Sequence, residues 1–298
     1  MTAVRVASWN LKARTGEAAA RLGTVLADHG GADLVLLQEA SQSGLPYFCE
    51  AAGLDWHVHV RDEFFDLLRV RGRAGGPAPN GNKYPNARAV AVAGRVERFR
   101  GTTAFPEVPL PEKVMAGWVD LGGVRTTVVS YHAPAGVSHL WKKPAQAVRL
   151  AEWLTQVDGP VIFGGDFNTP VADPPDFDRV HTHWHTGEPH LDGAPGDDLL
   201  VGPDPVHGLR DALRTYLGDR PEKLEAIRAE RPEGPLEVSH CTGPRDDQRY
   251  RYDAVWLSHH FRVDSVKYFY EESVEAGTDH GLVLVDATLT DSSSTGVV

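Results

Sequence analysis

Cysteine is scarce in this sequence, with only Cys49 and Cys241 among 298 residues. Two cysteines cannot form the disulfide framework that stabilises small secreted domains, although one pairing between them stays open. A reducing cytoplasm is the simplest compartment for such a chain, so we expect a cytoplasmic protein.

Long apolar runs are missing as well. No window of about 18 uninterrupted apolar residues occurs, so no membrane-spanning helix is predicted. The first ten residues, MTAVRVASWN, contain neither an apolar core nor a small-residue cleavage site, and no secretory signal is expected. The motifs G-x-S-x-G, H-E-x-x-H and G-x-x-x-x-G-K-[ST] are also absent. Enzymes that depend on those three motifs therefore find no support.

Positive charge is in deficit, because the net charge is −11 and the pI is near 5.7. Such an acidic chain is not typical of a protein that binds long duplexes regardless of sequence. Residues 61–100 differ, with nine Lys and Arg against four Asp and Glu. A solvated surface is the simpler interpretation of this segment, and a rim that attracts anions is the alternative.

Apolar runs of strand length recur along the chain. Residues 4–10 and 33–39 form two of them, and Leu22, Val25 and Leu26 predict a helix in between, which indicates an α/β layer. Gly122 and Gly123 separate two further runs and predict a hairpin. The remaining predicted strands cover residues 55–60, 87–93, 114–121, 124–131, 160–166, 251–258, 262–270 and 281–289.

Three further helices are predicted. The first begins at Pro144, the second covers residues 208–217, and the third covers residues 221–230, with Asp219 and Glu222 spaced as a capping box. Hydrophobic residues make up 41% of the chain, enough for one sizeable core. We therefore expect a single domain over residues 1–289, with a loop-rich insertion at about 171–248 and a disordered tail at 290–298.

Polar residues terminate or adjoin many of the predicted strands. A rigid sheet edge can hold several such side chains together, and close carboxylates repel one another unless a cation lies among them. Carboxylate and carboxamide oxygens are the ligands that Mg²⁺ prefers. Each residue alone also has a simpler interpretation, as a turn former, a solvated strand end, a hydrogen-bonded histidine or, for Asp253, a partner of Arg249 or Arg251. The set is Asn10, Glu39, His132, Asp166, Asn168, Asp253, Asp279 and His280.

The segments that carry these residues are, in order, SWNLK, LLQEA, SYHAP, GGDFNTP, RYDAVWLS and TDHGLV. Together they resemble the endonuclease/exonuclease/phosphatase superfamily, which includes deoxyribonucleases, apurinic-site endonucleases, inositol polyphosphate 5-phosphatases and neutral sphingomyelinases. The resemblance runs from residue 8 to residue 285. It implies an α/β (α+β) fold, a four-layer α/β/β/α sandwich of two mostly antiparallel mixed sheets flanked by helices.

The resemblance also implies a role for each residue. It makes Glu39 the main metal ligand, with Asn10 and Asp279 as further ligands of Mg²⁺, for which Mn²⁺ could substitute. It makes Asp166 the group that orients and deprotonates the attacking water. The phosphoryl group would be contacted by Asn168 and by His280, whose other ring nitrogen donates to Asp253. His132, on the opposite side, would contact a non-bridging oxygen or assist the leaving oxygen.

These roles predict hydrolysis of a phosphoester bond, with a phosphodiesterase or nuclease as the leading hypothesis and nucleic acid as a candidate substrate. The positioned charges suit a phosphoryl transition state, which spreads negative charge over equatorial oxygens. A phosphomonoesterase or lipid-headgroup hydrolase on the same scaffold is the alternative, and a non-catalytic binding module is less favoured. No protein partner can be inferred.

Substrate choice is expected to lie in the segments 61–86, 136–143 and 171–248. Trp141, Lys142 and Lys143 could bind a second phosphate or stack on a base, or could simply begin an exposed helix. Asn86 and Arg88 are weaker candidates for substrate contact. Alternate histidines at 181, 183 and 185 would share one face of an extended chain, which suits Zn²⁺ or an ordinary polar loop.

Overall fold

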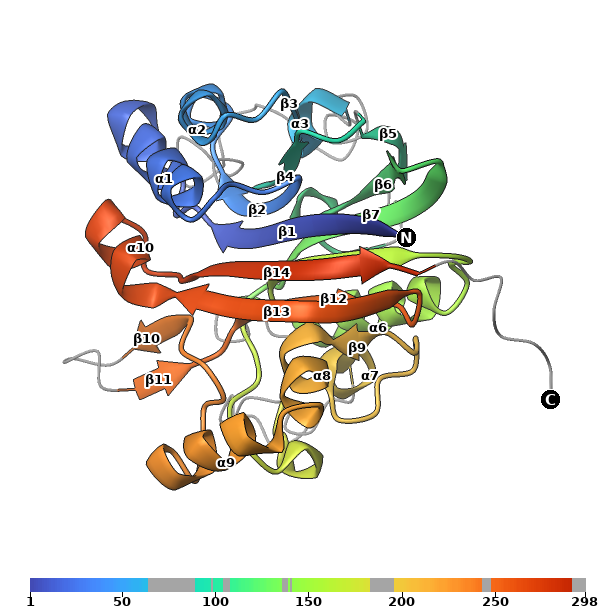
Figure 1. Ribbon diagram of the computed structural model, residues 1–298. Coiled ribbons are helices and arrows are strands. Elements are labelled where there is room, and N and C mark those ends of the chain that lie inside the picture. The colour runs from blue at the N-terminus through green and yellow to red at the C-terminus, as the bar shows by residue number, and fades with distance from the viewer. Residues whose placement is uncertain are drawn as a thin grey trace.

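The computed structural model describes residues 1–63, 89–97, 99–103, 108–135, 139, 141–182, 196–242 and 248–290. Within these residues two six-stranded mixed sheets pack face to face, with helices on their outer sides (Figure 1). The predicted four-layer α/β/β/α fold is therefore confirmed.

The first sheet has the order β13 (Phe261–Phe269), β14 (Leu282–Leu289), β1 (Thr2–Asn10), β2 (Leu34–Ala40), β4 (Ala89–Gly94) and β3 (Trp56–His59). Only β1 and β2 are parallel neighbours in it. The first strand alternates across the sheet: Val4 and Val6 face the second sheet, whereas Ala7 and Trp9 face the helices. Both faces of the strand thus carry buried apolar residues, which explains why its sequence does not simply alternate between apolar and polar.

The second sheet has the order β5 (Arg100–Thr103), β6 (Val114–Leu121), β7 (Val124–His132), β8 (Val161–Asp166), β12 (Asp253–Leu257) and β9 (Arg210–Asp211). The predicted hairpin joins β6 to β7, and Gly122 and Gly123 adopt the positive φ that its turn requires. A separate two-stranded sheet pairs β10 (His240–Thr242) with β11 (Gln248–Tyr250).

Helices complete the outer layers. The apolar face of α1 (Gly16–Asp28) packs with α2 (Leu45–Ala52) on the first sheet, and α10 (Tyr270–Ala276) lies beside them (Figure 1). The helices α6 (Lys142–Leu154) and α7 (Gly196–Val201) cover the second sheet, around Tyr131 and Phe163. Short segments α3 (Val60–Glu63), η1 (Pro111–Lys113) and η2 (Phe177–Arg179) connect the larger elements.

Local predictions for residues 208–230 needed correction. The first helix begins later than expected, because Arg210 and Asp211 pair with β12 as β9, and α8 spans Ala212–Gly218. Asp211 caps that helix by accepting from two backbone amides. The capping box predicted for α9 (Pro221–Glu230) is wrong, since the N-cap is Arg220 and makes no side-chain cap bond. Similarly, α6 begins at Lys142, two residues before Pro144.

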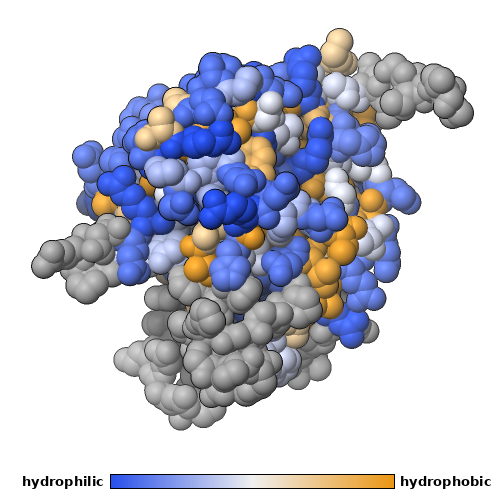
Figure 2. Space-filling model, turned by 90° about the horizontal axis from the view of Figure 1, so that it is seen from below, coloured by the Kyte–Doolittle hydropathy of each residue, from blue (hydrophilic) through white to orange (hydrophobic). Residues whose placement is uncertain are grey.

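No helix among the described residues is long and apolar enough to cross a membrane. The face shown in Figure 2 is largely hydrophilic where it is described, with smaller hydrophobic areas between the polar side chains. Both cysteines are free thiols, so the disulfide considered above is not formed. The predicted tail lies outside the described residues from residue 291 onward.

Candidate active site

Strand register places three site residues in one row. Asp166 ends β8, where it is paired with His132 of the parallel neighbour β7 and with Asp253 of the antiparallel neighbour β12. The glycines before Asp166 allow this packing: a Cβ at Gly165 would collide with the Tyr131 carbonyl oxygen, and one at Gly164 would lie 2.7 Å from a Leu36 methyl carbon. The second sheet therefore presents two carboxylates and one imidazole at one end of its central strands.

Asp166 lies at the centre of the candidate site. One carboxylate oxygen accepts from the Asn10 amide at 2.9 Å, and the other accepts from the Asn168 backbone amide at 2.9 Å. His132 Nε2 and His280 Nε2 approach the first oxygen to 3.5 and 3.8 Å. Burial raises the pKa of Asp166, but His280, His132 and the two hydrogen bonds outweigh burial and lower it. The carboxylate is therefore ionised at neutral pH.

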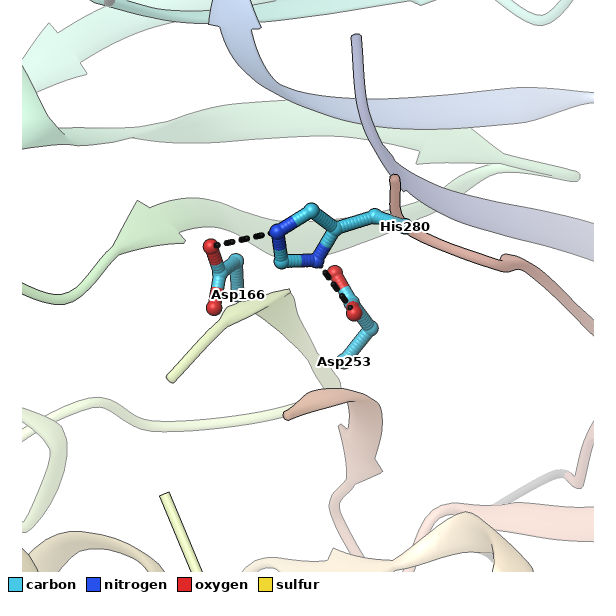
Figure 3. Close-up of side chains that lie close together, drawn as sticks. All are labelled: Asp166, Asp253 and His280. Atoms are coloured by element: carbon cyan, nitrogen blue, oxygen red, sulfur yellow. Dashed lines mark hydrogen bonds and ion pairs between the residues drawn. The ribbon is translucent and has the colours of Figure 1, made fainter. Parts of the chain in front are cut away.

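Asp253 and His280 form a buried pair (Figure 3). The Nδ1 atom of His280 lies 2.8 Å from Asp253 Oδ2, and its Nε2 faces Asp166. Burial alone would lower the pKa of His280, but Asp253 and Asp166 raise it to about 10. For Asp253, burial raises the pKa although His280 acts in the opposite direction. The geometry is therefore that of an imidazolium held between two carboxylates.

Glu39 reaches the same centre from the first sheet. Its Oε1 lies 3.9 Å from His132 Nε2, and its backbone adopts a φ of 45° where the pairing of β2 with β4 shifts register. Asn168, also with a positive φ of 49°, donates its amide to the Ala133 carbonyl. Left-handed backbone at non-glycine residues is strained and often marks functional positions. Of the four described non-glycine residues with this backbone, two belong to the predicted site, and the others are Lys12 and Ala13.

Lys113 was not predicted but contacts the site directly. Its Nζ lies 3.0 Å from His132 Nδ1, and because an ammonium only donates, Nδ1 accepts and the imidazole proton lies on Nε2. That proton points toward Asp166 and Glu39. The hairpin register could have revealed this contact, since Val114 pairs with Tyr131 and one further step places Lys113 opposite His132.

Asp279 joins the site through Lys12. The Lys12 ammonium lies 2.7 Å from an Asp279 carboxylate oxygen, and the Lys12 backbone amide donates to Asn10 Oδ1 at 3.0 Å. Burial raises the pKa of Asp279, but the hydrogen bond from Lys12 and the charge of His280 lower it. Lys12 therefore touches two of the three predicted metal ligands, another contact that sequence reasoning missed.

The two ends of the described fold meet at this site. Trp9 Nε1 donates to the His280 carbonyl at 2.9 Å, and Thr278 Oγ1 donates to the Asn10 carbonyl at 2.8 Å. These bonds hold the end of β1 against the turn before β14. Contacts of four ångström or less thus connect eight predicted residues, directly or through Lys12: Asn10, Glu39, His132, Asp166, Asn168, Asp253, Asp279 and His280.

The predicted substrate contacts are less well defined. Trp141 is 58% exposed and Lys142 is half-buried at the start of α6, so their binding role stays a prediction. Lys143 is buried, and its ammonium donates to the Phe167 and Asn168 carbonyls and pairs with Asp197. It anchors the turn after Asp166 instead of facing solvent.

Other candidates lie outside the described residues. Asn86 and Arg88 are among them, as are the second and third of the alternate histidines. The first, His181, forms backbone hydrogen bonds with Ala172 and Val171. The roles suggested for these positions therefore stay predictions.

The donor atoms of the site suit a hard divalent cation. Glu39, Asn10 and Asp279 offer oxygen ligands on the side of the first sheet, the chemistry that Mg²⁺ prefers. A second group, Asp166, Asp253 and His280, offers one ligand atom each within 4.8 Å of one another. Binding there would require a proton to leave His280 Nδ1 or Nε2, both of which face carboxylates. The oxygen chemistry of Glu39, Asn10 and Asp279 is the better match to Mg²⁺, while Lys12 contacts both Asn10 and Asp279.

The class of this protein is defined by two sheets between helices and by a cluster of acidic residues and histidines at one end of the strands of both sheets. Its sequence matches the Endonuclease/Exonuclease/phosphatase family over residues 7–280, and the chain belongs to that family. No curated protein sequence matches the chain significantly.

Several solved structures share the fold. TDP2 from D. rerio, solved in complex with a single-strand DNA product, is 16% identical with a TM-score of 0.61, covering 97% of this chain and 100% of that one. An AP endonuclease from Archaeoglobus fulgidus is 15% identical with a TM-score of 0.60, covering 96% and 99%. An endonuclease/exonuclease/phosphatase from Beutenbergia cavernae is 18% identical with a TM-score of 0.51, covering 97% and 72%.

Proposed function

We propose that this protein is a divalent-metal-dependent phosphodiesterase that acts on nucleic acid. The observation that carries the proposal is the ionised Asp166 carboxylate, held by Asn10 and Asn168 between the imidazoles of His132 and His280. A carboxylate in that position can accept a hydrogen bond from a water molecule, while the imidazole N–H groups beside it can donate to phosphate oxygens.

The reaction is hydrolysis, in which water attacks phosphorus and the ester oxygen leaves. Asp166 orients the water and accepts its proton, although its lowered pKa makes orientation the larger contribution. The His280 imidazolium, fixed by Asp253, donates to the phosphoryl group, where negative charge spreads in the transition state.

Two further residues complete the proposed mechanism. His132, whose proton Lys113 directs to Nε2, donates to a phosphate oxygen or to the leaving oxygen. Glu39, with Asn10 and Asp279, would hold Mg²⁺ or Mn²⁺, which when bound supplies positive charge to the phosphate oxygens.

Nucleic acid is favoured as substrate by two considerations. Solved proteins that share the fold include an AP endonuclease and a protein solved with a single-strand DNA product. The acidic net charge of this chain favours single-stranded or short substrates over long duplexes. Trp141, exposed at the start of α6, is proposed to stack on a base, with Lys142 near the phosphates.

A substrate panel with and without metal tests the proposal. It contains plasmid DNA, single-stranded DNA, RNA, bis-p-nitrophenyl phosphate, p-nitrophenyl phosphate and inositol phosphates. We expect diester cleavage that disappears in EDTA and returns with Mg²⁺ or Mn²⁺. Cleavage of monoesters alone would favour the phosphomonoesterase or lipid-headgroup alternative, and activity that persists in EDTA would exclude the metal.

The position of the metal has its own test. Glu39→Ala should weaken Mn²⁺ binding at least about tenfold, because it removes one of the two carboxylates of the proposed oxygen set, and the other, Asp279, is paired with the Lys12 ammonium. Electron paramagnetic resonance of free Mn²⁺ measures the affinity without any turnover. Asp253→Asn is the comparison. A larger loss in Asp253→Asn than in Glu39→Ala would move the metal to the Asp166, Asp253 and His280 group.

We also propose a cytoplasmic location, which is supported by the two unpaired thiols. Fractionation of the native host, with detection of the protein in each fraction, tests it. Recovery outside the cytoplasm would reject it.

A further inference from the structure

A segment outside the predicted site is joined to the catalytic turn by its backbone. Residues 239–240, at the start of β10, lie antiparallel to the turn that precedes β14. His240 forms a β-bridge with His280, and the Gly281 amide donates to the Ser239 carbonyl at 2.7 Å. The Ser239 side chain accepts from the Asp253 amide at 2.9 Å. This segment therefore contacts both members of the Asp253–His280 pair.

The His240 ring lies flat against the ring of His280. Their centroids are 4.3 Å apart and their planes are inclined by 23°. Tyr252 stacks on His240 at 5.4 Å, with planes inclined by 28°. His240 Nδ1 lies 2.8 Å from the Asp279 carbonyl oxygen, and because a carbonyl only accepts, this nitrogen donates. The ring is thus fixed by its stacking partners and at one edge.

The stack supplies a restraint that the Asp253 hydrogen bond cannot supply. A single hydrogen bond to Nδ1 fixes one atom of the His280 ring, and the ring can still tilt about that contact. A flat neighbour at 4.3 Å opposes the tilt, because tilting would separate or overlap the two rings. The direction of Nε2, on the far side of the ring from Asp253, depends on this plane.

We infer that His240 is a positioning residue, which holds the plane of the His280 ring so that Nε2 points at the phosphoryl group. The inference rests on the proposed function. It adds to that function a residue whose ring face packs on His280 and Tyr252 and does not contact the reacting atoms. In this role the His240 ring acts through His280, so its loss should affect the transition state more than substrate binding.

Two variants separate the stack from the hydrogen bond. His240→Leu removes the flat ring, and we expect kcat to fall about tenfold with KM changed less than twofold, the scale of a modest misplacement. His240→Phe keeps a flat ring but loses the Nδ1 donor, and kcat should stay within threefold of the wild type. His259→Leu is the control, since the exposed His259 ring lies 4.0 Å from the His260 ring, outside the site.

A second measurement does not depend on turnover. Long-range ¹H–¹⁵N spectra report the ring atoms of His280, whose signals should shift in His240→Leu and stay close to those of the wild type in His259→Leu. Circular dichroism melting of each variant establishes that it is folded. Unchanged kcat and unchanged His280 signals in a folded His240→Leu would overturn the inference, and equal losses in His240→Leu and His240→Phe would overturn the role of the stack.

The inference and the proposed function fail in different ways. A wild-type protein that cleaves no member of the substrate panel would overturn the proposed function, and the His280 spectra would still decide whether His240 holds the ring. An active wild type with an unaffected His240→Leu variant would overturn the inference alone.

Discussion

Asp166→Asn is expected to lower kcat on a cleaved phosphodiester at least about a hundredfold, the scale for loss of a positioned proton acceptor. The amide has nearly the same shape as the carboxylate but only one accepting oxygen. Two donors, from Asn10 and Asn168, already point at the carboxylate, so one of them would face an NH₂ group. The water would therefore lose its acceptor, and the site would lose one of its negative charges.

The measurement is steady-state turnover at saturating Mg²⁺. Asp178→Asn is the matched control, because Asp178 is an exposed residue of η2 and the same chemical change there should leave kcat within twofold. Thermal melting of both variants separates lost chemistry from lost fold. A folded Asp166→Asn with a rate within threefold of the wild type would contradict the assignment of Asp166.

Arg251→Met is expected to lower the free energy of unfolding by about 3–5 kcal/mol, the usual cost of breaking a buried ion pair from one side. Arg251 is buried and contacts Asp173 at 2.5 and 3.2 Å and Asp211 at 2.8 Å. Among the described residues, Arg214 alone would remain to pair with these two carboxylates. The substitution should also disturb the candidate active site, because Arg251 lies two residues before Asp253.

Acid should expose the same network in the wild type. Burial raises the pKa of Asp173, but Arg251 and Arg214 outweigh burial and lower it from 3.8 to about 2. A lowered pKa in the folded state stabilises the fold above pH 4, and this contribution, about 2 kcal/mol, is lost as the pH falls toward 2. Arg251→Met should therefore lose less stability over this interval than the wild type.

Urea unfolding followed by circular dichroism at pH 7 and at several values down to pH 2 measures both effects. Arg262→Met is the control, since Arg262 pairs with Asp264 at the surface and its removal should cost at most about 0.5 kcal/mol. Equal stabilities of Arg251→Met and Arg262→Met at pH 7 would contradict the expected contribution of the buried network.

Much of the fold was readable from the sequence where the signal is local. The run at residues 4–10 became β1, and the glycine pair at 122 and 123 became a hairpin turn, because apolar runs and turn chemistry act over a few residues. Errors occurred where a distant strand decides the outcome. Residues 210 and 211 read as the start of a helix, yet pairing with β12 draws them into the sheet.

The candidate site shows the same division. Its acids and histidines stand out because each adjoins an apolar strand, and the motifs gave their order. Their cationic neighbours did not stand out, since Lys12 reaches Asp279 across 267 positions of sequence and Lys113 reaches His132 only through a hairpin register. His240 did not stand out in the sequence either, because its partner is set by a β-bridge between residues forty positions apart.

The hydrogen bonds that tie β1 to the turn before β14 have a consequence for biosynthesis. Asn10 is made early and His280 late, so a ribosome must translate almost every described element before the two can meet. Until then the nascent chain lacks both His280 and β14, the antiparallel partner of β1. For an enzyme of the proposed function, the candidate site is therefore complete only near the end of synthesis of the described chain.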